Sequence, residues 1–230
     1  MLKRIGILGG CSPESTVEYY RTMTRGFTRR FGTHAYPEIV IHSVTFERFI
    51  LWMRARDWRS LAEGIADGLD VLDRAGAEVG LIASNTFHLV FDEATASTSM
   101  QMVSMLDVVA DRLGALGCRR AGLLGTKITM DSSFYPERLM RSGIETLVPP
   151  VGEREVVDRI VFEDLSRGAV TDEARDVLRA IAGRLVDRGA DAIILGCTEL
   201  PVLMDEGELS VPILDTTTLH ANAGLEMALS

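Results

Sequence analysis

The feature that most constrains the fold of this chain is that its second half repeats its first. The run GILG at residues 6–9 returns as GLLG at 122–125, 116 positions later. The stretch GAEVGLIAS at 76–84 returns as GADAIILGC at 189–197, 113 positions later. The Leu-Asp pair at 106–107 returns at 214–215. Landmarks repeated in one order at nearly constant spacing indicate an internal duplication, so we expect two units of similar fold.

Within each half, short apolar runs alternate with amphipathic stretches. Runs such as RIGILGG at 4–10 and DAIILGC at 191–197 predict strands, and the stretches 57–75 and 171–188 have apolar residues at helical spacing. Strands that are apolar throughout are typical of parallel sheets covered by helices on both faces. The predicted fold class is α/β, with two similar parallel-sheet lobes related by a pseudo-twofold. We expect the active site in the interlobe cleft, at the carboxyl ends of the strands.

The predicted first lobe comprises residues 1–100 plus about 208–230, and the predicted second lobe comprises 101–207. The helix expected after each fourth strand, at about 107–117 and 216–229, starts where a crossing to the other lobe is shortest. We therefore expect the C-terminal helix to pack on the first lobe.

The composition limits the classes of function. Of 230 residues, 47% are hydrophobic, which is enough for sizeable cores, and the net charge of −9 argues against nucleic acid or membrane as a partner. No apolar stretch is long enough to span a membrane, and the start of the chain does not resemble a secretory signal. Three cysteines make neither a disulfide framework nor a zinc pattern. We expect a cytoplasmic protein with reduced thiols.

The motif GILGGCSPEST at residues 6–16 predicts a strand, a glycine turn and a helix start. Ser12 suits the N-cap and Pro13 the first helical position, which gives a backbone cradle for a carboxylate or phosphate. The alternative is a plain strand-to-helix turn, because the spacing matches neither a dinucleotide-binding nor a P-loop motif. We expect the Cys11 side chain to form part of a pocket wall without chemistry of its own.

Two polar triplets follow the matched third strands. Ser84, Asn85 and Thr86 offer hydroxyl and amide donors for an anion, although a helix cap would use the same residue types. In the second half, Cys197 follows a buried strand at a helix start, where a thiol pKa of roughly 8.5 can fall. A thiolate there would be a nucleophile or a base. The alternative, an inert buried thiol, fits Cys118 better.

Other catalytic classes find little support. Neither His88 nor His220 has an evident orienting carboxylate, so both are expected to be capping or core residues rather than part of a triad. No ligand cluster has zinc spacing, so no metal site is predicted. The only lysines, Lys3 and Lys127, lack the context of a pyridoxal Schiff base, and no cofactor is expected.

Taken in order, the motifs GILGGCSPEST, SNT, GLLGTKITM, VFEDLSRG and GCTEL resemble the cofactor-independent aspartate/glutamate racemases, in particular their aspartate racemase branch. The resemblance covers essentially the whole chain. In that family each lobe supplies one cysteine; one removes the α-proton of the substrate and the other returns a proton from the opposite face. The resemblance implies a small-molecule acidic amino acid as substrate, and a homodimer.

Carried over by position, the resemblance makes Cys197 the base on one face and assigns substrate contacts to the residues around it. Arg48 and Arg167 match segments that bind the distal carboxylate, with Arg167 where lysine is frequent; the alternative for both is a solvated surface side chain. The implied substrate-binding residues are Cys11, Arg48, Asn85, Thr86, Thr126, Arg167, Thr198 and Glu199.

The sequence departs from the family motif Cys-Asn-Thr at its first residue, which here is Ser84. A neutral serine accepts protons poorly but can donate one, so we expect slow turnover or a bias toward the L enantiomer as substrate. Three alternatives remain open. The chain could be a single-thiol decarboxylase or isomerase of the same superfamily, carry an introduced Cys→Ser exchange, or be a non-catalytic protein that binds acidic amino acids.

Overall fold

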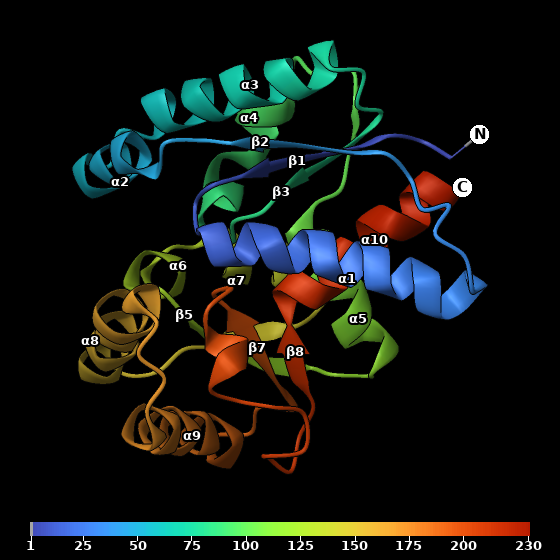
Figure 1. The fold of residues 1–230 in the computed structure, drawn as a ribbon. Coiled ribbons are helices and arrows are strands. Elements are labelled where there is room, and N and C mark those ends of the chain that lie inside the picture. The colour runs from blue at the N-terminus through green and yellow to red at the C-terminus, as the bar shows by residue number, and fades with distance from the viewer. Residues whose placement is uncertain (1) are drawn as a thin grey trace. The chain divides into compact units, whose positions relative to one another are not determined.

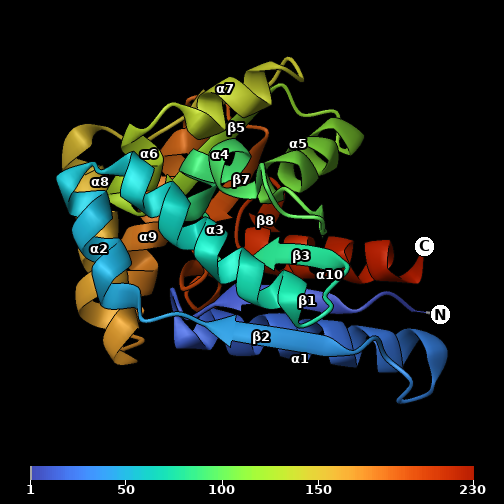
Figure 2. The same cartoon turned by 90° about the horizontal axis from the view of Figure 1, so that it is seen from above.

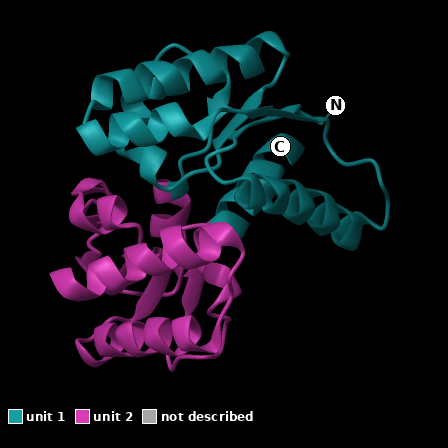
Figure 3. Ribbon diagram, turned by 60° about the vertical axis from the view of Figure 1, so that its left-hand side comes forward, with its two compact units in different colours: residues 1–105, 217–230 teal, residues 106–216 magenta. Residues whose placement is uncertain are grey.

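The computed structural model describes residues 2–230, which form two compact units (Figure 3). The first unit holds the described residues up to Met105 together with Thr217–Ser230, and the second holds Leu106–Thr216. Among the described residues, no helix has both the length and the apolar character needed to cross a membrane.

The first unit contains a parallel four-stranded sheet in the order β2-β1-β3-β4. Its elements are β1 (Ile5–Gly9), α1 (Pro13–Phe31), β2 (Ile39–Ser43), α2 (Phe46–Ala55), α3 (Trp58–Arg74), β3 (Val79–Ile82), the 3₁₀ helix η1 (Thr86–Val90), α4 (Phe91–Thr95), β4 (Gln101–Met102) and α10 (Thr216–Leu229). Figure 1 shows α3 on one face of the strands and α1 and α10 on the other.

The second unit contains a parallel sheet in the order β6-β5-β7-β8. Its elements are α5 (Met105–Ala115), β5 (Arg120–Gly125), α6 (Lys127–Asp131), α7 (Phe134–Met140), β6 (Glu145–Leu147), α8 (Val151–Arg159), the π-helical turn η2 (Ile160–Asp164), η3 (Leu165–Arg167), α9 (Asp172–Asp187), β7 (Ala192–Gly196), η4 (Leu200–Val202) and β8 (Ile213–Asp215). The same strand order in both units confirms the predicted α/β class with two similar parallel-sheet lobes.

The equivalent glycines Gly6 and Gly122 stand in the first strand of each unit because a side chain does not fit there. A Cβ on Gly6 of β1 would lie 2.8 Å from the Cβ of Ala77, and one on Gly122 of β5 would lie 2.5 Å from Cδ1 of Ile193 and 3.1 Å from Cδ1 of Leu185. Side chains at these positions would collide with the residues that pack against each central strand. The other residues of β1, β3 and β7 are buried, as expected for strands covered on both faces.

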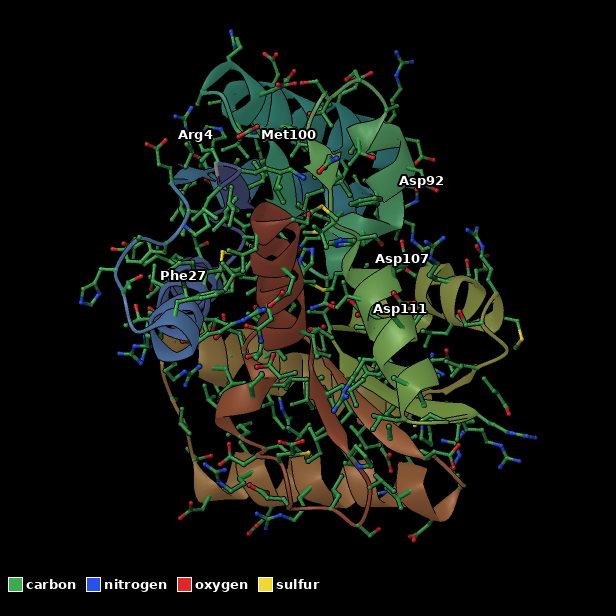
Figure 4. All side chains as sticks on the ribbon, turned by 90° about the vertical axis from the view of Figure 1, so that its right-hand side faces the viewer. Arg4, Phe27, Asp92, Met100, Asp107 and Asp111 are labelled. Atoms are coloured by element: carbon green, nitrogen blue, oxygen red, sulfur yellow. The ribbon has the colours of Figure 1, made fainter. Side chains whose placement is uncertain are left out.

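Helix α10 is built into the first unit. The backbone N–H of Lys3 donates to the carbonyl of Ala228 at 3.0 Å, and a Cβ on Gly224 would lie 2.6 Å from Cδ1 of Leu81 in β3. Figure 2 shows α10 running along β3 and α1 along β2. On α1, Phe27 (Figure 4) packs against Phe31 with ring centroids 4.6 Å apart.

The boundaries between the units lie further along the chain than the sequence prediction placed them. The units divide at 105/106 and 216/217, rather than at 100/101 and about 207/208. The reason is that each fourth strand pairs with the third strand of its own sheet: β4 pairs with β3, and β8 with β7. Beyond the first boundary, α5 carries Asp107 and Asp111 (Figure 4), and Asp107 forms an ion pair with Arg138 of α7.

Candidate active site

The two matched triplets begin in the same local structure. Ser84 lies just after β3 and Cys197 directly after β7, and each leads into a short 3₁₀ helix. The Oγ of Ser84 accepts the backbone N–H of Phe87, three residues on, at 3.4 Å. At Cys197 the backbone N–H of Leu200, also three residues on, donates to the Cys197 carbonyl at 3.2 Å. The N–H groups of Glu199 and Leu200 both lower the pKa of the thiol. The duplication therefore extends to the backbone donors at each strand end.

Cys197 is a buried thiol with only 9% of its surface exposed. Burial is the main influence on this group and raises the pKa of Cys197 to about 12. The two backbone N–H groups lower that pKa, while the carboxylates of Glu199 and Asp158 raise it. Burial therefore favours the protonated thiol in the free protein, and a positive charge brought beside the sulfur would lower its pKa.

Asp158 is a site residue that sequence reasoning missed. It lies on α8, and its Oδ1 accepts the backbone N–H of Lys127 at 2.6 Å, at the start of α6. Its charge also reaches Cys197, 39 positions away in the sequence. No local motif marks Asp158, because only the packing of α8 against the start of α6 brings it there. Beside it, Thr126 caps α6 and accepts the N–H of Thr129 at 3.3 Å.

The turn after β1 carries a second thiol, that of Cys11, and places it near Ser84, which follows β3. Ser12 caps α1 by accepting the N–H of Ser15 at 3.3 Å, with Pro13 in the first turn, which confirms the predicted helix start. The preceding residue, Cys11, is partly exposed, and its thiol lies near the side chain of Ser84. Burial of the sulfur raises the pKa of Cys11, and the hydrogen bond from Ser84 lowers it.

The carbonyl of Ser84 is held by His88, whose side chain is 3% exposed. Nε2 of His88 accepts the backbone N–H of Met105 at 3.1 Å, so Nδ1 carries the ring proton and donates it to the Ser84 carbonyl at 2.8 Å. Burial lowers the pKa of His88 to about 4. A neutral imidazole of defined tautomer therefore fixes the Ser84 turn.

A second buried histidine extends this network. His220 of α10 donates from Nε2 to the carbonyl of Val103 at 2.9 Å and accepts the Tyr19 hydroxyl proton at Nδ1, at 2.7 Å. Its ring lies 5.6 Å from that of His88, centroid to centroid. Burial, with a smaller contribution from His88, lowers the pKa of His220 to about 3. Both histidines are thus core residues, as predicted, with the added role of joining α1, α10 and the Ser84 turn.

The remaining predicted residues divide between the units. Asn85 is 4% exposed and Thr86 begins η1, while Thr198 and Glu199 are half-buried before η4. Arg48 is exposed on α2, with its guanidinium 5.1 Å from the ring centroid of Phe49.

Arg167 is exposed at the end of η3, before a left-handed Gly168. The structure thus brings Cys11 to Ser84, and Glu199 and Asp158 to Cys197. That the two strand ends face one cleft stays a prediction. Within residues 2–230, no three His, Cys, Asp or Glu side chains are grouped to hold a metal ion.

Comparison with known proteins places the chain in a family. The family model described as Asp/Glu/Hydantoin racemase matches residues 8–224, which is nearly the whole sequence. The chain belongs to the Asp/Glu/hydantoin racemase family. Among curated relatives of this racemase-family chain is the broad specificity amino-acid racemase RacX of Bacillus subtilis (strain 168), 25% identical over 95% of each chain.

Two solved structures cover the whole of this family member and are themselves covered completely. One is a putative Asp/Glu racemase from Yersinia pestis, with 35% identity and a TM-score of 0.92. The other is an aspartate racemase homologue from Pyrococcus horikoshii OT3, with 36% identity and a TM-score of 0.87. The two-lobed fold is therefore shared in full with members of the racemase family.

Proposed function

We propose that this protein is a cofactor-independent racemase of aspartate or glutamate in which Cys197 is the base on one face of the substrate. The observation that carries the proposal is the backbone cradle around its sulfur, at the end of β7. The N–H groups of Glu199 and Leu200 lower the pKa of this thiol and so favour the thiolate, which is the form that removes a proton. The matched cradle at Ser84 supports a second proton-handling group of different strength.

The substrate itself supplies a positive charge beside Cys197, which the free site lacks. The α-ammonium group of an amino acid brings a positive charge, which opposes the burial that keeps Cys197 protonated and favours its thiolate. The thiolate then takes the α-proton, and the electron pair left on Cα delocalises into the α-carboxylate. Asn85, Thr86, Thr126 and Thr198 would donate hydrogen bonds that stabilise this charge. Glu199 lies beside the sulfur and orients the ammonium group.

The distal carboxylate distinguishes acidic from apolar substrates. Arg48 and Arg167 are exposed cations, and a guanidinium matches a carboxylate with two parallel hydrogen bonds. We assign them to this carboxylate, and we expect a homodimer that works in the cytoplasm.

The exchange of Cys for Ser at position 84 makes the two faces unequal. Enantiomers have equal free energies, so kcat/KM for inversion is the same in both directions whatever the groups. The inequality instead affects kcat and the exchange of the α-proton without inversion. We expect this exchange to be faster for the L enantiomer, on whose face Cys197 would act.

The test is incubation with L-aspartate or L-glutamate in deuterated water. Proton NMR follows loss of the α-proton, and chiral chromatography follows inversion. A racemase gives both, and the variant Cys118→Ser should match the wild type because Cys118 lies away from both strand ends. Exchange without any inversion would point instead to the single-thiol chemistry of a decarboxylase or isomerase. Saturable binding without exchange would point to a binding protein.

A further inference from the structure

The two units differ in the turn that leads from the first strand to its helix. In the second unit β5 ends at Gly125, and Thr126 caps the next helix at once. In the first unit β1 ends at Gly9, but the helix cap is Ser12. Two residues, Gly10 and Cys11, are therefore additional in the first unit, and one of them carries a thiol.

Gly10 makes this longer turn possible. Its φ of +90° lies in the region that favours glycine, and a Cβ there would lie 2.5 Å from the carbonyl oxygen of Val44. Its N–H is bound by the Thr16 hydroxyl at 3.0 Å, which fixes the turn to α1. The turn therefore has one defined shape, and that shape sets the position of Cys11.

The same turn delivers the Cys11 thiol to Ser84. Strands β1 and β3 are neighbours, with Leu8 opposite Ile82, so residues just beyond them lie side by side. The hydroxyl of Ser84 lies near enough to the thiol of Cys11 to lower its pKa, and Ser84 Oγ also accepts the Phe87 N–H at 3.4 Å. In the first unit the thiol of Cys11 therefore follows β1, whereas the position that matches Cys197 follows the neighbouring strand β3. That position is occupied by Ser84, which lies near the Cys11 thiol.

We infer that Cys11 is the second sulfur of the reaction and that it acts through the Ser84 hydroxyl as a two-residue proton relay. This inference rests on the proposed racemase function. In the return step, Ser84 Oγ gives its proton to the carbanion at Cα, and a C–H bond forms as the O–H bond breaks. Ser84 Oγ takes the proton of Cys11 Sγ in the same step, so Cys11 ends as a thiolate and Cys197 as a thiol.

The chemistry of the two groups suits this order. An aliphatic hydroxyl alone is a much weaker acid than a thiol, so passing the charge to sulfur makes the return step easier. The hydroxyl of Ser84 then donates to the new thiolate, which is the interaction that lowers the pKa of Cys11. Burial is the larger influence: it raises the pKa of Cys11 above that of an ordinary thiol and keeps Cys11 protonated between turnovers, ready to donate.

The test compares Cys11→Ser, Cys11→Ala and Ser84→Ala with the matched control Cys118→Ser, using an L substrate in deuterated water. The ratio of the inversion rate to the exchange rate separates proton return on the Ser84 face from proton removal on the Cys197 face. The relay predicts that all three site variants keep exchange on the L enantiomer, which Cys197 performs alone. Their inversion should fall by about 10²-fold. The double variant of Cys11→Ala and Ser84→Ala should be no worse than either single change.

Retained exchange also shows that each variant is folded. An inversion-to-exchange ratio in Cys11→Ser equal to that of the wild type would overturn the relay while leaving the racemase proposal intact. A wild type that shows no exchange would remove the racemase proposal and the relay together.

A second measurement does not depend on turnover. The rate at which iodoacetamide alkylates Cys11 is followed against pH by peptide mass spectrometry, with Cys118 as internal reference. Removing the Ser84 hydroxyl should move the Cys11 profile to higher pH, because the thiolate loses its hydrogen-bond donor. An unchanged profile in Ser84→Ala would mean that the two groups are not coupled, and the relay would be wrong.

Discussion

The ends of β3 and β7 are built alike but carry different groups. At both, a backbone N–H from three residues further along acts on the residue that begins the turn. Phe87 donates to Ser84 Oγ, and Leu200 donates to the Cys197 carbonyl and lowers the pKa of its thiol. The side chain that begins the turn carries a hydroxyl at Ser84 and a thiol at Cys197. The difference teaches that the two units share a backbone donor at the strand end but differ in the side-chain atom there, which is a hydroxyl oxygen in one and a sulfur in the other.

The surroundings of the two ends differ in charge as well. The carboxylates of Glu199 and Asp158 influence Cys197, whereas the Ser84 carbonyl is bound by His88, and His220 lies against His88. Burial keeps both imidazoles neutral. The second unit thus presents a thiol whose charge is sensitive to its neighbours. The first presents an uncharged turn fixed by hydrogen bonds.

The largest effect on α-proton exchange is expected when the end of β7 is made to resemble the end of β3. Cys197→Ser leaves no thiol in that cradle, and we expect α-proton exchange from the L substrate to fall by about 10²–10⁴-fold. NMR in deuterated water measures the loss. Cys118→Ser is the control, because it removes a thiol that is 8% exposed and outside both turns. Equal losses in both variants would contradict the special role of Cys197.

Acid should destabilise the first unit through its histidines. An unfolded histidine titrates near 6.5, but His88 does so at about 4 in the folded chain, so at lower pH the unfolded chain binds protons that the folded chain does not. Stability is complete above about 6.5 and falls as the pH drops to about 4, by about 3 kcal/mol for His88.

Denaturant unfolding at several pH values measures this slope. In His88→Asn the slope over that range should be shallower than in the wild type. Replacing His34, which is exposed, is the matched control and should leave it unchanged. Equal slopes in His88→Asn and the wild type would show that the buried imidazole does not govern acid stability.

Giving the end of β3 the thiol that stands at the end of β7 sharpens the comparison between the two strand ends. Ser84→Cys places sulfur in both cradles, so exchange from the D enantiomer should rise toward the rate from the L enantiomer. Inversion should rise equally in both directions, because the equilibrium constant stays at one. Initial rates with each enantiomer measure both effects. No gain in D exchange would mean that position 84 does not handle a proton.

The smallest effect concerns the charge beside Cys197. Asp158→Asn keeps an oxygen that can accept the Lys127 N–H but removes the negative charge that raises the pKa of Cys197. Alkylation of Cys197 at a fixed pH should therefore become a few-fold faster. Glu155→Gln removes a charge from the same helix, where Glu155 pairs with Lys127, and should change the rate less. The reverse order of effects would contradict the role of Asp158.

Much of the fold followed from the sequence because the determining signals are local. Apolar runs predicted β1, β3, β5 and β7, and Ser12 with Pro13 predicted the start of α1. Unit boundaries were less accurate, because they depend on the pairing of each short fourth strand with the third strand of its own sheet, which the sequence does not show.

The site was predictable only where the duplication marked it. The match between the two halves predicted Ser84 and Cys197 as candidate site residues, whereas the positions of Asp158 and of Cys11 near Ser84 depend on which elements pack together. No spacing along the chain encodes that Cys11 follows a strand adjacent to the one that ends before Ser84. The same limit applies to the hydrogen bonds that fix the tautomers of His88 and His220.

The most direct test of the unequal strand ends is the initial rate of α-deuteration of the two enantiomers of one substrate. Wild-type protein is incubated separately with L- and D-aspartate, and then with L- and D-glutamate, in deuterated water at the same concentration. We predict that the L enantiomer of the preferred substrate gains deuterium faster than its D counterpart. Equal rates for both enantiomers, or deuteration of neither, would contradict the account.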